Sequence, residues 1–243
     1  MRSRNVVKFI VFINLMNILL SDEFETKLGT IKTWIESSIN NLTVAKDGNL
    51  LTTKNYRIRL ESVALPNETQ YNSYSLPKKI ESLIAWPWFI EKIGNVDEQL
   101  AIFCQLVNAQ SDTSWDYSSG ECLDAIEIEN QTYNLHIGTE DAEVLQYRAY
   151  QNDWMPKRFQ NLLGWHENEK YYSEYSFIEY IDFGFKINIP NLLKNEKIYF
   201  HFLVATNPIK QSQEYPRERD VSTWLAVDCS KRYLDEYLDN MTR

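Results

Sequence analysis

The segment Ile198–Thr206 limits what this chain can fold into more than any other part of it. In an extended conformation its apolar side chains fall on both faces: Ile198, Phe200, Phe202 and Val204 on one, and Tyr199, Leu203 and Ala205 on the other. Such a pattern is typical of a strand that is covered on both sides. The sequence therefore predicts a β-sheet with this segment in its interior.

Weaker patterns predict further strands. Alternation of apolar and polar residues indicates half-buried strands, and near-continuous apolar runs indicate strands covered on both faces. These segments are Tyr56–Glu61, Gln99–Val107, Ile126–Ile128, Tyr133–Ile137, Val144–Tyr150, Phe185–Ile189 and Val221–Val227. The residues Glu129–Gln131 separate two of them and predict a hairpin.

Helical spacing appears mainly near the N-terminus. Residues 22–42 are predicted to form an amphipathic helix, because apolar residues recur at intervals of three and four. They are Phe24, Leu28, Ile31, Trp34, Ile35, Ile39 and Leu42. A short helix is predicted from Pro77, carrying Ile80, Leu83 and Ile84, and Trp86-Pro87-Trp88-Phe89 is expected to anchor its end. Two more helices are predicted, at Pro156–Leu163 and around Tyr233, Tyr237 and Leu238.

Loops and hairpins, rather than long helical crossovers, connect the later strands. The predicted fold is mainly β (α+β): an antiparallel β-sandwich or open barrel with an N-terminal amphipathic helix and a short C-terminal helix. Residues 21–243 are expected to form a single β-rich globular domain, with residues 21–95 as an alternative subdomain of helix and strand. Residues 1–20 are set apart as a signal-like or extension segment.

The N-terminal segment allows two interpretations. Arg2, Arg4 and Lys8 precede the apolar run Phe9–Leu20, as in a signal peptide. Two asparagines interrupt the run, however, and no small-residue cleavage site ends it. The run is also shorter than the roughly 20 apolar residues that span a bilayer. We expect a cytoplasmic protein with no transmembrane segment, and export is the alternative if this run acts as a signal peptide.

The chain is acidic, with a formal net charge of −9, and its Lys and Arg residues are scattered. Nucleic acids and anionic lipids are bound through clustered cations. The composition therefore argues against a nucleic-acid partner and leaves another protein as the expected one.

The three cysteines have no zinc-ligand spacing. Cys104 lies in an apolar strand pattern and is expected to be a buried free thiol. A Cys104–Cys122 disulfide is the alternative in an oxidising compartment.

The sequence contains no GxSxG elbow, Gly-rich phosphate loop, HExxH or GxGxxG motif. These absences argue against the commonest hydrolases and nucleotide-dependent enzymes, so no cofactor is predicted and no catalytic residue is assigned. His201 is expected to be buried, either as a neutral core imidazole or as a group tuned for proton transfer. His136 lies between two apolar residues of an alternating strand and is expected to face solvent.

Residues 112–124 are predicted to form an acidic loop. Asp112, Asp116, Glu121 and Asp124 offer the hard oxygen ligands that calcium prefers, beside a glycine. Their spacing does not match the EF-hand loop. They are a weak calcium candidate, and a solvated acidic loop is the simpler interpretation.

Aromatic residues in polar segments are the best candidates for a binding surface, because flat rings bury apolar area at low entropic cost and are enriched at interfaces. Two arginines in a later loop suit carboxylate recognition. The candidate binding residues are Trp115, Asp116, Tyr117, Trp165, His166, Arg217 and Arg219.

Two classes of function follow from these residues. The absent catalytic signatures and the aromatic, acidic segments favour a non-enzymatic protein-interaction module. The alternative is a carbohydrate-binding or carbohydrate-cleaving protein, in which Trp115 or Trp165 stacks on a sugar. Its carboxylates would come from Asp116, Glu121, Glu167 or Glu179, and cleavage needs two of them across a cleft, about 5–5.5 Å or about 6.5–9.5 Å apart.

Overall fold

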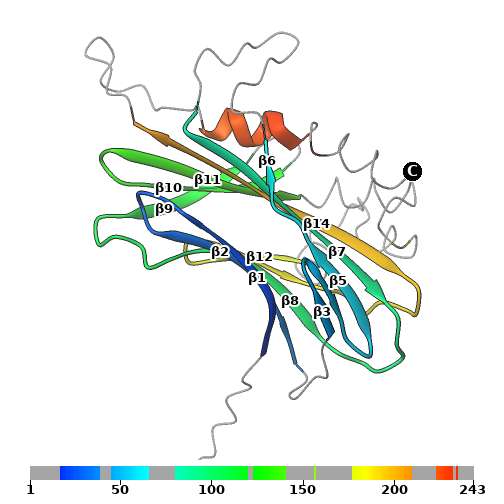
Figure 1. Cartoon of the computed structure of the whole chain (residues 1–243). Coiled ribbons are helices and arrows are strands. Elements are labelled where there is room, and N and C mark those ends of the chain that lie inside the picture. The colour runs from blue at the N-terminus through cyan, green and yellow to red at the C-terminus, as the bar shows by residue number, and fades with distance from the viewer. Residues whose placement is uncertain are drawn as a thin grey trace, which may run out of the picture.

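The computed structural model describes residues 17–38, 45–65, 80–119, 123–140, 156, 177–209, 223–231 and 234. In these parts of the chain, fourteen strands form two antiparallel sheets, and residues 223–231 form a helix. The sheets face each other as a sandwich and neither closes into a barrel (Figure 1). The mainly β, antiparallel architecture predicted from the sequence is confirmed.

The smaller sheet has five strands in the order β1-β2-β8-β13-β12, and each neighbouring pair is antiparallel. These strands are β1 (Asn17–Glu25), β2 (Thr30–Ser37), β8 (Leu100–Val107), β13 (Gly184–Asn188) and β12 (Ile178–Ile181). Four residues of the segment expected to be signal-like, 17–20, thus belong to β1, and Leu20 is buried there.

The larger sheet has nine strands, in the order β3-β4-β5-β7-β14-β11-β10-β9, with β6 pairing with β7 beside this path. They are β3 (Ala45–Asp47), β4 (Leu50–Thr52), β5 (Tyr56–Leu60), β6 (Val63–Ala64), β7 (Ser82–Lys92), β14 (Lys197–Pro208), β11 (Tyr133–Glu140), β10 (Leu123–Glu129) and β9 (Ser114–Ser119). The long central strand β14 is buried on both faces, as Ile198–Thr206 predicts.

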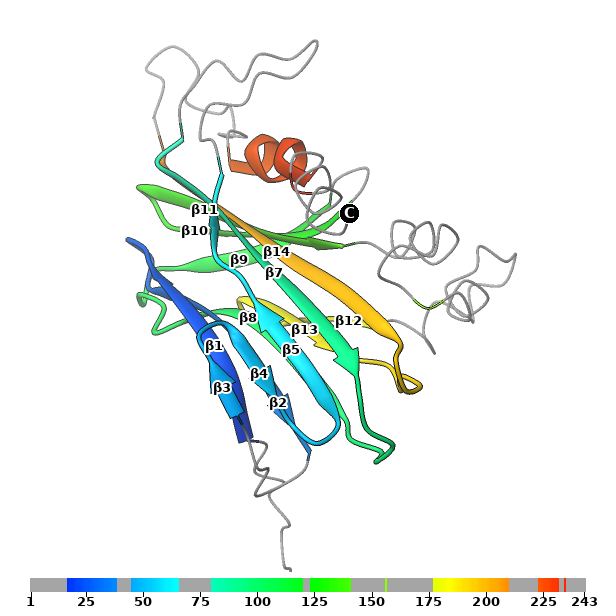
Figure 2. The same cartoon turned by 45° about the vertical axis from the view of Figure 1, so that its right-hand side comes forward.

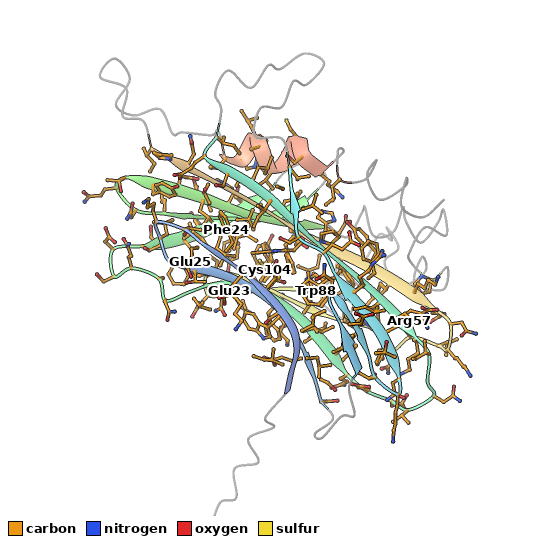
Figure 3. The ribbon with its side chains drawn as sticks, in the orientation of Figure 1. Glu23, Phe24, Glu25, Arg57, Trp88 and Cys104 are labelled. Atoms are coloured by element: carbon orange, nitrogen blue, oxygen red, sulfur yellow. The ribbon has the colours of Figure 1, made fainter. Side chains whose placement is uncertain are left out.

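The main core lies between the two sheets, and two indoles of β7 cross it. Trp86 and Trp88 are fully buried. Trp86 Nε1 donates to Asp22 Oδ2 of β1 at 2.8 Å, and Trp88 Nε1 donates to Thr33 Oγ1 of β2 at 3.0 Å. Trp88 and Cys104 are seen between the sheets in Figure 3. Cys104 is a free thiol, as expected, and burial raises its pKa well above the usual value.

A third layer covers part of the outer face of the larger sheet. The helix 223–231 lies on the side of β7 and β14 that faces away from the smaller sheet (Figures 1 and 2). Its Ala226 and Val227 pack with Ala85 of β7 and with Leu203 and Ala205 of β14 in a second apolar cluster. No helix in the described parts of the chain is long and apolar enough to cross a membrane.

The predicted N-terminal helix is wrong: its described residues form the hairpin β1–β2, and residues 39–42 lie outside the described part. The turn between the strands contains Gly29 at φ 145°, and a Cβ there would lie 2.8 Å from the carbonyl oxygen of Asn108. In β2 every second side chain is buried, from Ile31 to Ser37. Counting apolar residues alone hid this period of two, because polar Thr33 and Ser37 also face the core.

The short helix expected from Pro77 is also wrong, because Ser82–Lys92 is strand β7. The Trp86–Phe89 motif does not anchor a helix end but forms the middle of this strand. Pro87 is accommodated because its backbone groups point to the side of β7 where β5 ends and β6 begins. On that side its carbonyl oxygen accepts a hydrogen bond from Glu61 N at 3.1 Å, and no neighbouring strand needs an N–H from residue 87. On the other side it forms a pair with His201. A missing N–H therefore removes no bond to β14.

Residues 223–227, expected within a last buried strand, belong instead to the helix 223–231. Its buried residues recur at spacings of three and four, including Thr223, Ala226, Val227 and Ser230. This is the pattern of a helix on a sheet rather than of a strand. The expected C-terminal helix around Tyr233 lies outside the described residues except for the buried Leu234.

We expect Trp88→Ala to lower the free energy of unfolding by about 4 kcal/mol, because it opens a cavity between the sheets. The matched control is Trp34→Ala, since Trp34 is half-buried on the outer face of β2, where it stacks on Phe103 at 4.9 Å. Its loss should stay below about 2 kcal/mol. Urea unfolding followed by far-ultraviolet circular dichroism measures both, and equal losses would contradict the bridging role of Trp88.

Candidate functional site

Three residues predicted to bind a ligand, Trp115, Asp116 and Tyr117, lie together on β9. The segment is a strand rather than the expected loop, because its aromatic and polar side chains alternate as the two faces of a sheet require. In the described parts of the chain, β9 pairs only with β10 and forms one edge of the larger sheet. The site is therefore placed on an open sheet edge.

A chain of aromatic rings connects this edge with the smaller sheet. Tyr117 contacts Trp115 at 5.4 Å and Tyr180 of β12 at 5.0 Å between ring centroids. Trp115 lies 6.4 Å from Phe183, and Tyr180 lies 4.9 Å from the buried Phe185. We name Trp115, Tyr117, Tyr180 and Phe183 the aromatic rim. It closes one open side of the sandwich, where β9 and β12 are the edge strands of the two sheets.

Tyr117 is the exposed end of the aromatic rim. Its relative exposure is 65%, whereas Phe185 at the other end of the ring chain is fully buried. A hydrogen bond from Tyr180 Oη to Asp124 Oδ1, 2.8 Å long, ties β12 to β10 below it. Burial and the Asp124 carboxylate raise the pKa of Tyr180, and burial raises the pKa of Asp124. The Tyr180 hydroxyl therefore keeps its proton at neutral pH and continues to donate to Asp124.

Phe183 adopts an unfavourable backbone conformation in the turn between β12 and β13. Its φ is 57°, a left-handed value that costs a residue with a side chain about 1 kcal/mol. Leu106 N donates to its carbonyl oxygen at 3.0 Å, and Gln105 Nε2 donates to the carbonyl oxygen of Asp182 at 2.9 Å. These bonds to β8 hold the turn in place with the Phe183 ring near Trp115.

On the edge strand β9, a side-chain carboxylate accepts a hydrogen bond from one of the backbone N–H groups of the strand. Tyr117 N donates to the side chain of the preceding residue, Asp116 Oδ1, at 2.8 Å. That N–H is therefore directed out of the sheet rather than to β10. The edge strand β1 has the same arrangement, in which Glu23 N donates to Asp22 Oδ1 at 3.0 Å. Such carboxylates limit uncontrolled pairing of edge strands.

The weak calcium candidate is not brought together by the described residues. Asp116 pairs with Glu127, so these two side chains lie on the same face of the sheet. Asp124 precedes Glu127 by an odd number of residues and therefore points to the opposite face from Asp116. Asp112 is exposed in the connection before β9, and Glu121 lies outside the described residues. In the described parts of the chain no cluster of His, Cys, Asp and Glu is suited to a metal ion.

The other predicted binding residues, Trp165, His166, Arg217 and Arg219, lie outside the described residues. Glu167, from the carbohydrate hypothesis, lies outside them as well. Glu179 is described on β12, where Lys186 Nζ donates to its Oε2 at 3.1 Å and lowers its pKa. An ionised carboxylate of this kind cannot serve as a general acid at neutral pH.

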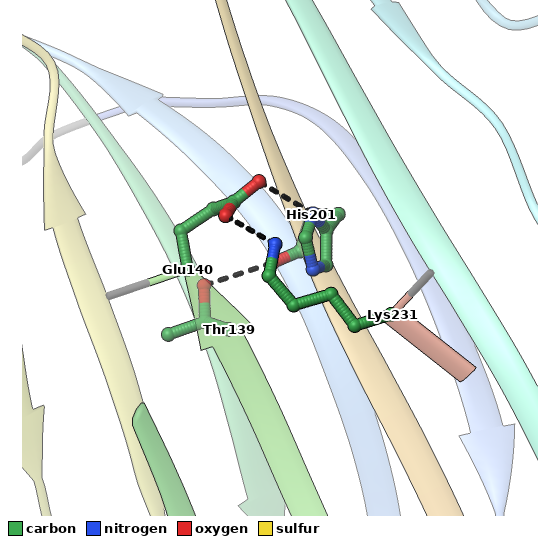
Figure 4. Close-up of polar contacts among 4 residues, drawn as sticks. All are labelled: Thr139, Glu140, His201 and Lys231. Carbon is green, nitrogen blue, oxygen red and sulfur yellow. Dashed lines mark hydrogen bonds and ion pairs between the residues drawn. The ribbon is translucent and has the colours of Figure 1, made fainter. Parts of the chain in front are cut away.

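Sequence reasoning missed a buried polar cluster beneath the helix. Lys231 Nζ donates to Glu140 Oε2 at 2.6 Å, and His201 Nδ1 lies 3.0 Å from Glu140 Oε1 (Figure 4). The side chains of Glu140 and His201 are fully buried. Thr139 Oγ1 donates to the His201 carbonyl oxygen at 2.8 Å and ties β11 to β14 at the same place. His201 is buried, as predicted, and its neighbour is a carboxylate.

The first residue of the helix is also held by buried polar groups. Thr223 Oγ1 lies 2.9 Å from His136 Nδ1 and donates to Asn134 Oδ1. Asn134 Nδ2 in turn donates to Glu127 Oε1 at 2.6 Å. The helix is thus attached to the sheet by buried polar contacts at both ends, with an apolar contact between them. We call these contacts the polar clasp, formed by Glu127, Asn134, His136, Glu140, His201, Thr223 and Lys231.

The prediction that His136 faces solvent is wrong, because its face of β11 is covered by the helix. Alternation correctly separates His136 from Leu135 and Ile137, but the polar face is buried as well. Burial lowers the pKa of His136 to about 3. The polar residues Asn134, His136 and Glu140 recur at even positions of β11. This row of polar side chains on one face of the strand is the sequence signal that could have indicated the buried polar cluster.

Comparison of the chain with family models, with curated proteins and with solved structures finds no match in any of the three. The function must therefore be argued from the geometry of the chain itself.

We expect Lys231→Met to lower the free energy of unfolding by about 3 kcal/mol, because it leaves the buried Glu140 carboxylate without its ammonium partner. The double variant Lys231→Met/Glu140→Gln should recover at least about 1 kcal/mol of this loss. The control is Lys186→Met, which breaks a surface pair and should cost less than about 1 kcal/mol. Urea unfolding measures all three, and a Lys231→Met loss no larger than the control's would contradict the polar clasp.

Stability is expected to depend on pH through His136. Free imidazole takes up a proton near pH 6.5, whereas burial keeps His136 neutral in the folded chain down to about pH 3. The unfolded state binds more protons in this window, so stability present above it is lost as the pH falls.

A single such group contributes a slope of at most about 1.4 kcal/mol per pH unit between roughly pH 6 and pH 5. The variant His136→Asn should lack this contribution and show a shallower slope. Urea midpoints at several pH values across the window provide the measurement. Identical slopes for the two proteins would mean that the folded chain can protonate His136.

Proposed function

We propose that this chain is a non-enzymatic protein-interaction module, which binds an extended segment of a partner protein along β9 and the aromatic rim. The observation that carries the proposal is the position of Tyr117. It is a large aromatic residue, 65% exposed, on a strand that forms an open sheet edge. Tyrosine in such a position offers apolar area, a polar tip and little side-chain entropy to lose.

The backbone of β9 supports an extended partner segment. A sheet edge binds an added strand through main-chain hydrogen bonds, while its side chains supply specificity. The Tyr117 N–H is directed out of the sheet, and the Asp116 carboxylate now accepts its hydrogen bond. A partner carbonyl oxygen would take the place of that carboxylate. The aromatic rim would then contact the apolar side chains of the added strand.

The charge of this region favours a basic partner segment. Asp112 and Asp116 are both exposed, on or just before β9, and the chain as a whole has a formal net charge of −9. A Lys or Arg in the partner would meet Asp116 once it has released Tyr117. Electrostatic complementarity of this kind raises association rates and specificity.

The alternative, a carbohydrate-binding or carbohydrate-cleaving protein, draws on the same rings, and two of its four proposed carboxylates, Asp116 and Glu179, lie in the described parts of the chain. Asp116 lies on the outer face of the larger sheet, because its neighbours Trp115 and Tyr117 face inward. Glu179 lies on the outer face of the smaller sheet, because Tyr180 faces inward. The two carboxylates therefore point away from each other and do not flank one glycosidic bond.

We expect a photo-crosslinking phenylalanine analogue at position 117 to yield one discrete protein adduct in the cells that make this chain. The control places the analogue at Leu193, which is similarly exposed at 62% but lies far from β9 in the chain. Mass spectrometry of the adduct should locate the crosslink in a segment with alternating apolar residues and at least one Lys or Arg. The proposal fails if position 117 gives no adduct, or the same adducts as position 193.

A further inference from the structure

A second surface, separate from the aromatic rim, lies on the outer face of the larger sheet. It is a shallow pocket of about 260 Å³. It is lined by Leu50, Arg57, Arg59, Phe89, Ile90, Glu91 and Lys197. These residues come from β4, β5, β7 and β14, whereas β11 and β10 separate the pocket from β9. Figure 3 shows Arg57 at this end of the sandwich, away from Glu23 and Glu25.

Strand register arranges the pocket in two rows. In one row Leu50 pairs with Arg59 and Arg59 with Phe89. In the next row Arg57 pairs with Glu91, and Glu91 pairs with Lys197. One carboxylate therefore lies between two cations, and a third cation lies beside an aromatic ring. The described lining carries three cations and one carboxylate, and with Glu61, the ion-pair partner of Arg59, the formal charge is +1, on a chain whose net charge is −9.

The two arginines are held in defined positions. Arg57 Nη1 lies 2.7 Å from Glu91 Oε2. The Arg59 guanidinium lies 4.1 Å from the centroid of the Phe89 ring, and its Nε lies 3.3 Å from Glu61 Oε1. A guanidinium stacked on a ring can still donate hydrogen bonds from its edges. Both side chains remain accessible, at 52% for Arg57 and 36% for Arg59.

We propose that this pocket binds a small aromatic carboxylate. The carboxylate would accept hydrogen bonds from the Arg59 fork, with Lys197 adding positive charge. The ring of the ligand would lie against Leu50, over a floor to which the buried Phe89 contributes. Arginine suits this task because its planar fork matches the two oxygens of a carboxylate. The pocket, of about 260 Å³, is large enough for a ligand with one aromatic ring or two fused rings. This site is independent of the proposed protein-interaction function.

The test uses the full chain, labelled with ¹⁵N, and 2-naphthoate as the probe. We expect saturable shifts of the backbone amides of residues 57, 59, 89, 91 and 197. The neutral amide of the same shape, 2-naphthamide, should bind at least about tenfold more weakly, because it lacks the charge that the arginine fork recognises. Raising the salt concentration should weaken binding of 2-naphthoate but not of 2-naphthamide.

Two single-charge variants separate a built site from general attraction to cations. Arg59→Gln should weaken 2-naphthoate binding by about tenfold or more. Lys186→Gln removes a cation from another cross-strand pair, 3.1 Å from Glu179, and should leave binding unchanged. Amide shifts away from the pocket verify that both variants keep the fold. Equal binding of the two probes, equal loss in both variants, or shifts that do not saturate would each overturn the proposal.

Discussion

The two indole groups of β7 are the contacts on which the rest of the structure depends. Trp86 and Trp88 reach from the larger sheet to Asp22 and Thr33 of the smaller one, and both rings are fully buried. A large ring fixes the distance between the sheets, and its N–H must find an acceptor in the interior. With the sheets fixed in this way, β9 and β12 lie at the same side of the sandwich, where their rings form the aromatic rim.

The outer face of the larger sheet is divided into two regions by one helix. Where residues 223–231 cover it, polar groups such as His136 and Glu140 are buried and are satisfied by Thr223 and Lys231. Beyond the helix, Arg57 and Arg59 on the same face remain accessible. The same kind of outward-facing polar residue therefore holds the third layer in one region and lines a pocket in the other.

Several predictions from the sequence were correct because the segments concerned have either a regular period of two or an apolar run that is covered on both faces. The strands around Ile58, Ile187 and Val204 and the hairpin at Glu129–Gln131 are examples. The failures share a different cause. In β2 the core side includes Thr33, and in β7 a proline lies in mid-strand, so hydrophobicity alone suggested helices. Trp115, Asp116 and Tyr117 lie on strand β9, where a loop was expected.

The sequence by itself determined that the chain is mainly β, with β14 buried on both faces and Cys104 and His201 in the interior, because each is local to one strand pattern. Tertiary structure alone decided which polar faces are covered. His136 is buried because a helix some ninety residues later packs on it, and Tyr117 is exposed because β9 ends the sheet. Alternation separates the two faces of a strand, but it does not specify what will lie against either one.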